Sequence, residues 1–125
     1  MTAPSAPVSP KRQVIEAYGG GGFRVSGIAH IGSILILTER TVPWPVVSAE
    51  QITIENLSPI VEAAAQVELL LLGCGPKIST TLVELGAALK IKSIAVEVMD
   101  TGAACRTFNL LMAEDRLIAA ALVAV

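Results

Sequence analysis

Histidine and cysteine, which supply many catalytic groups and metal ligands, are scarce in this sequence. Among 125 residues there is one histidine, His30, and there are two cysteines, Cys74 and Cys105. Two cysteines without a CxxC spacing build no disulfide framework, which favours a reducing, cytoplasmic location. A lone histidine offers no recognisable Ser-His-Asp or Cys-His relay and would need scattered ligands to hold a metal. The sequence therefore predicts no metal and no cofactor, and favours a role without catalysis over an enzyme.

Concentrated positive charge is also missing. The formal net charge is −2, and Lys11 and Arg12 are the only adjacent basic residues. Proteins that bind nucleic acid present a basic patch to the phosphates, so this chain is not expected to bind nucleic acid. The glycine-rich phosphate-binding patterns GxGxxG and GxxxxGK[ST] do not occur either.

Long hydrophobic runs are absent, although 53% of the residues are hydrophobic. The longest unbroken run, residues 117–125, has nine residues, whereas a spanning helix needs about 20. The first ten residues contain three prolines and no apolar segment, which resembles neither a secretory signal nor a transit peptide. We therefore predict a protein that does not span a membrane, with a disordered arm over residues 1–13 and one domain over residues 14–125.

The pattern that is present is typical of an α/β domain. Residues 14–18 and 23–25 flank the glycine run 19–22 and predict a β-hairpin. Residues 28–37 form an almost unbroken apolar run and predict one strand in the interior of a sheet. Two prolines in the segment 42–47 exclude a central strand there, which indicates an edge or a covering loop.

The second half predicts a strand, a helix and a strand over residues 67–72, 80–90 and 93–99. Such a unit implies two parallel strands joined by a right-handed crossover. A further helix is predicted after Met99, with Asp100 or Thr101 as its N-cap. The apolar run 117–125 then predicts a strand in the centre of the sheet, because both of its faces are apolar.

Candidate site residues gather where the two parallel strands end. Because both strands end at the same edge, the turn 73–77 should lie beside the turn 100–102, an edge that ligands favour in open α/β sheets. The predicted site consists of Gly73, Cys74, Gly75, Lys77, Asp100, Thr101, Cys105, Arg106 and Asn109.

Two interpretations of this site remain open. Free N–H groups at the helix start and the Arg106 guanidinium suit an anionic ligand. Alternatively, Arg106 pairs with Asp100 or Glu97 while Asn109 bonds backbone. Cys74 and Cys105 are either buried small residues or a redox pair.

Trp44, between Pro43 and Pro45, is the only tryptophan. It either covers the core or anchors a protein partner, since tryptophan is enriched in binding hot spots. Exposure of the indole distinguishes the two roles.

A long set of motifs resembles the Mth938-like family, formerly the domain of unknown function DUF498. The set comprises Tyr18-Gly19-x-Gly21-x-Phe23-x-Val25-x-Gly27, His30-x-Gly32-Ser33, Trp44, Leu72-Gly73-x-Gly75 and the run from Met99 to Glu114. The resemblance implies a three-layer α/β fold with helices, a β-hairpin layer and a central, mixed, mostly parallel sheet of five strands. It further implies that the last strand is inserted centrally, antiparallel to the rest.

The same resemblance implies a function, because the family includes an assembly factor of respiratory complex I. We therefore expect a non-enzymatic binding protein, a factor in the assembly of the respiratory NADH dehydrogenase, whose partners are subunits or assembly factors of that complex. The alternative is a small-molecule or anion-binding protein with a pocket around Arg106 and Asn109. The oligomeric state does not follow from the sequence.

Overall fold

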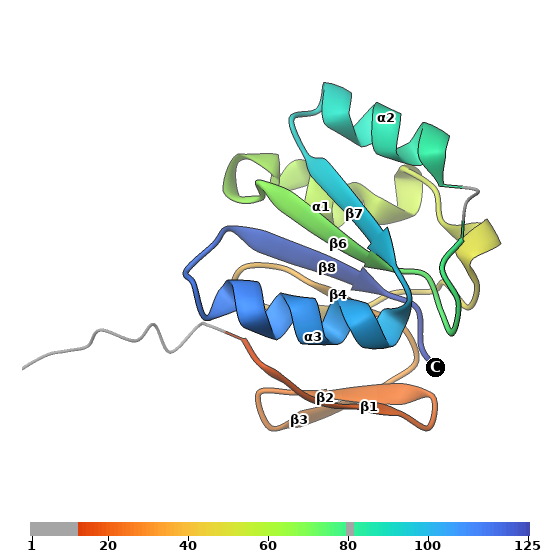
Figure 1. Ribbon diagram of the computed structural model, residues 1–125, viewed down its shortest axis with the longest axis vertical. Helices are drawn as coiled ribbons and strands as arrows, with labels where there is room; N and C mark the ends of the chain where they lie inside the picture. The colour runs from red at the N-terminus through yellow and green to blue at the C-terminus, as the bar shows by residue number, and fades with distance from the viewer. Residues whose placement is uncertain (1–12, 80–81) are drawn as a thin grey trace, which may run out of the picture.

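Two β-sheets and three α-helices make up the domain in the computed structural model, which describes residues 13–79 and 82–125 (Figure 1). The small sheet has the order β1-β2-β3 and the large sheet the order β5-β4-β8-β6-β7. The strands are β1 (Ile15–Gly19), β2 (Gly22–Val25), β3 (Ile28–Ile31), β4 (Ile34–Ile36), β5 (Thr41–Pro43), β6 (Leu69–Gly73), β7 (Ala95–Met99) and β8 (Ile118–Leu122). The helices are α1 (Ser58–Glu62), α2 (Val83–Ile91) and α3 (Thr101–Met112), with short 3₁₀ turns at Ala49–Gln51, Glu55–Leu57 and Ala64–Gln66.

The large sheet is covered on both faces, which gives three layers. Helices α1 and α2 lie on one face, while α3 and the small sheet lie on the other (Figure 1). Alternate residues of the central strands enter two separate cores: Leu70 and Leu72 join the first, and Leu71 joins the second. The three-layer α/β fold expected from the resemblance is confirmed.

The last strand is central, as predicted, and it is buried along its whole length. Its direction differs from the expectation, because β8 runs parallel to β6 and antiparallel only to β4. The strand that opposes the others is β4, which is antiparallel to both of its neighbours. The reason is local: β8 follows α3 directly, and a strand–helix–strand crossover returns the chain in the same direction.

The prediction of one strand over residues 28–37 was wrong. β3 belongs to the small sheet and β4 to the large one, and Ile31 is 97% exposed whereas Ile34 is buried. Gly32, between them, has φ +85°, a left-handed conformation that turns the chain out of the first sheet. Apolar content alone concealed this break.

Gln13, the last residue of the predicted arm, packs against the domain. The Gln13 side chain is buried, donates to the Leu37 carbonyl and accepts a hydrogen bond from the Thr41 hydroxyl, so it belongs to the domain. The rest of the predicted arm, residues 1–12, and the predicted helix start at Thr80 and Thr81 lie outside the described residues.

Candidate functional site

Thr101 joins three segments at the carboxyl edge of the large sheet. Its hydroxyl accepts a hydrogen bond from Gly75 N (2.9 Å) and donates one to the Val123 carbonyl (2.7 Å). Its backbone N–H donates to the Gly75 carbonyl (2.8 Å), and its side chain is fully buried. The two predicted turns therefore do lie side by side, and Thr101 holds them together.

The start of α3 is closed by the chain itself. Asp100 is the N-cap, as one of the two predicted alternatives had it, and its carboxylate accepts from Ala103 N (2.9 Å). Gly73 permits this close packing, because a Cβ there would lie 2.9 Å from Thr101 Cα. The N–H groups of Thr101, Ala103 and Ala104 are thus already bonded, which leaves fewer donors for an anion than predicted.

Asn109 attaches the small sheet to α3. Its amide accepts from Ile15 N and donates to the Ile15 carbonyl, both at 2.8 Å, in the way that a neighbouring strand would pair. The prediction that Asn109 bonds backbone is confirmed. The polar face of α3 therefore binds the outer edge of β1.

Arg106, one turn earlier, contacts the same strand. Its guanidinium donates to the Tyr18 hydroxyl (2.7 Å) rather than to Asp100 or Glu97, and no ion pair of Arg106 occurs within the described ranges. The predicted pairing with either carboxylate was therefore wrong. Because Arg106 is exposed, water solvates its charge, and no anionic guest is required.

The two cysteines lie in different cores, on opposite faces of the large sheet. Cys74 Sγ accepts from Ser79 N (3.1 Å) and lies 3.2 Å from the Lys77 carbonyl. Burial raises the pKa of Cys105 to about 12, although the nearby Arg106 charge opposes that shift. A neutral, buried thiol is unreactive, so the structure supports packing and not a redox pair.

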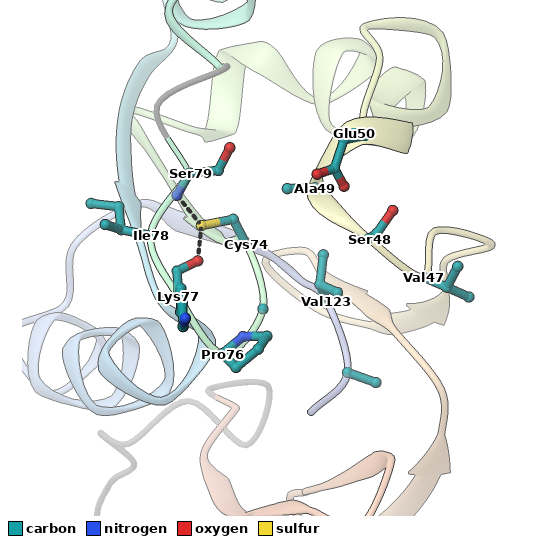
Figure 2. A pocket seen from close by; sticks show the side chains of 12 residues that line it. Val47, Ser48, Ala49, Glu50, Cys74, Pro76, Lys77, Ile78, Ser79 and Val123 are labelled. Carbon is teal, nitrogen blue, oxygen red and sulfur yellow. Dashed lines mark hydrogen bonds between the residues drawn. The ribbon is translucent and has the colours of Figure 1, made fainter.

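Six of the nine predicted site residues line two separate hollows, and Gly73, Asp100 and Thr101 line neither of the two. One, of about 450 Å³, takes in Cys74, Gly75 and Lys77, which face residues 47–50 and Val123 across it (Figure 2). The other, of about 350 Å³, is lined by Cys105, Arg106 and Asn109 together with residues 15–18 of β1. Lys77 and Arg106 therefore do not converge on one ligand.

Trp44 is 4% exposed and packs in the first core. Its indole N–H donates to the Asn56 carbonyl (2.9 Å). Of the two predicted roles, covering the core fits this position. The role as an anchor for a protein partner does not, because an enclosed ring cannot contact another protein.

Two further residues, Tyr18 and Ser33, form contacts that the sequence did not predict. Tyr18 supplies the partner of Arg106, and the Ser33 hydroxyl accepts from Ala124 N (2.9 Å). Both contacts join residues about ninety positions apart in the chain. No local periodicity signals such pairs.

Removing the Asn109 amide should loosen the small sheet. We expect Asn109→Ala to lower the free energy of unfolding by about 1–3 kcal/mol, because it leaves Ile15 N–H and C=O half-buried without partners. Urea unfolding followed by circular dichroism measures this. Arg106→Ala, at an exposed contact, should cost less than about 1 kcal/mol.

Since both side chains hold β1, the double variant should depart from the sum of the single effects by about 0.5 kcal/mol or more. Strict additivity would show that the two contacts act independently.

The geometry defines a class of protein: a small three-layer α/β domain whose candidate residues chiefly join its sheets and helices. The family model described as "Protein of unknown function (DUF498/DUF598)" matches residues 15–123. The chain belongs to this DUF498/Mth938-like family.

Relatives and solved structures agree with this membership. The zebrafish (Danio rerio) protein named "NADH dehydrogenase [ubiquinone] 1 alpha subcomplex assembly factor 3" is 40% identical over 88% of this chain, which spans 63% of that relative. A structure titled as an outer membrane protein from Bartonella henselae has a TM-score of 0.86 at 41% identity and covers 93% of this chain and 98% of its own. A Mth938-like domain from Bordetella pertussis has a TM-score of 0.81 at 28% identity, and the match covers 99% of this chain and 92% of that domain's chain. None of the helices in the described residues has the length and apolar character of a membrane-spanning segment.

Proposed function

We propose that this chain is a non-enzymatic protein-binding factor in the assembly of the respiratory NADH dehydrogenase. The observation that carries the proposal is its 40% identity to the zebrafish assembly factor over 88% of the chain. The chain spans 63% of the length of that relative, so the proposal concerns only the matched region.

The geometry gives this role indirect support. The side chains of Thr101, Asp100 and Asn109 each form hydrogen bonds within the chain. The neutral Cys105 thiol is a poor nucleophile. The anion-binding alternative has less support, since Lys77 lines a different hollow from Arg106 and the Asn109 amide is bonded to Ile15.

A chimera tests the proposal. In zebrafish cells that lack the assembly factor, a chimera is expressed in which this chain replaces the matched region of that factor. The unmatched segments of the factor are kept. We expect the chimera to restore the level of assembled NADH dehydrogenase on native gels. The intact relative is the positive control and an empty vector the negative control. A chimera that accumulates normally and leaves the complex at the empty-vector level would refute the proposal.

A further inference from the structure

Strand β3 is an edge strand without the protection that free sheet edges normally carry. Natural proteins block such edges with charged residues, proline, bulges or covering groups, because exposed N–H and C=O groups pair with other strands. β3 reads Ile-Ala-His-Ile, contains no Asp, Glu, Lys, Arg or Pro, and pairs with β2 in an unbroken register. Ile28 is 63% exposed and Ile31 is 97% exposed.

The other sheet edges differ in this respect. The Asn109 amide occupies the outer edge of β1, where the register is also irregular between Ile15 and Ala17. β5 ends in Pro43, and β7 carries the exposed Glu97. Within the ranges that the structure describes, β3 is the edge that none of these devices blocks. It lies in the small sheet, below α3 in Figure 1.

The turn that precedes β3 determines which of its groups point outward. Ser26 and Gly27 both have positive φ, +48° and +84°, as in a two-residue type I′ turn. The residues that flank such a turn, Val25 and Ile28, form a hydrogen-bonded pair, and the pattern alternates along the strand. The N–H and C=O groups of Ala29 and Ile31 therefore face away from β2.

We propose that β3 pairs antiparallel with β3 of a second copy of this chain, about a two-fold axis at His30. This register sets Ala29 of each copy opposite Ile31 of the other, which forms about four N–H···O bonds and joins the two small sheets into one. Self-association of this kind goes beyond the proposed function and does not depend on it.

The side chains fit this register. Directly paired residues share a face of a sheet, so the Ile31 side chain lies between Gly22 of its own chain and Ala29 of the second copy. Both neighbours are small and leave room for the isoleucine. β3 has no Asp, Glu, Lys or Arg to repel its equivalent across the axis. Because the strand is short, we expect a weak, concentration-dependent dimer.

Sedimentation equilibrium tests the dimer. We expect the average mass of the wild-type chain to rise from monomer toward dimer between about 10 μM and about 1 mM, the range of a weak interface. Ile31→Lys, at a fully exposed position, should weaken association at least about tenfold. Leu110→Lys, at a 63% exposed position on α3, is the matched control and should associate as the wild type does. A monomeric mass for the wild-type chain throughout, or equal association of the two variants, would overturn the proposal.

Cross-linking tests the register. His30→Cys places two cysteines directly opposite, with Cα atoms about 4.5 Å apart, within disulfide range. Ala29→Cys sets its two cysteines on a diagonal about 7–8 Å apart, beyond that range. Under mild oxidation we expect a covalent dimer of His30→Cys and much less of Ala29→Cys, with the wild-type chain as the control for buried Cys74 and Cys105. Equal or absent cross-linking of the two variants would refute this pairing.

Discussion

Thr101→Val should lower the free energy of unfolding by about 2–4 kcal/mol. Valine keeps the volume of threonine but removes the hydroxyl that accepts from Gly75 N and donates to the Val123 carbonyl. Both backbone groups bond to a side chain that is fully buried, and the loss of a hydrogen bond costs the most free energy at a buried position. Urea unfolding measured by circular dichroism and by fluorescence of the single tryptophan gives the difference.

Thr101→Ser is the matched control. It retains the hydroxyl and loses one methyl group, so it should cost only about 1 kcal/mol. If valine and serine destabilise the protein equally, then the hydroxyl does not hold the three segments together and packing alone explains the position.

Phe108→Ala should cost about 3–5 kcal/mol. The ring is fully buried in the second core, between α3 and residues from both sheets, such as Phe23 and Leu71. Alanine removes the transfer free energy of the ring and leaves a cavity that the surrounding sheets cannot close. A domain of this size has a total stability of about 5–15 kcal/mol, so the variant should unfold at a much lower urea concentration.

The exposed Leu110, on the same helix, provides the comparison. Leu110→Ala should change stability by less than about 0.5 kcal/mol. A loss below about 1 kcal/mol for Phe108→Ala would mean that the second core repacks around the missing ring.

The helix after Met99 could be predicted in detail because its signals are local. Asp100 caps it, and Ala104, Phe108 and Met112 are buried at helical spacing. The glycine run at 19–22 likewise predicted the β1–β2 hairpin. These elements depend on neighbours within a few residues, which the sequence displays directly.

The candidate site could be predicted only in part, because only some of its contacts follow from local sequence. The adjacency of the turns at Gly75 and Thr101 follows from the parallel crossover, and the structure bears it out. The choice of partner for Arg106 does not, because Tyr18 reaches it through the packing of the small sheet. The carboxylates of Asp100 and Glu97 and the hydroxyl of Tyr18 are all chemically suitable partners for Arg106. Only the position of β1 selects Tyr18.

The α/β class, the parallel crossover, the central position of β8 and the capped start of α3 could all be predicted from the sequence, because they depend on periodicity, capping and apolar content within short segments. The break between β3 and β4, the burial of Trp44 and the separation of Lys77 from Arg106 in two hollows depend on how distant parts of the chain pack. A hydrophobic run does not say which sheet it enters, because that depends on surfaces supplied by distant parts of the chain. One left-handed glycine, Gly32, thereby places Ile31 in solvent and Ile34 in the core.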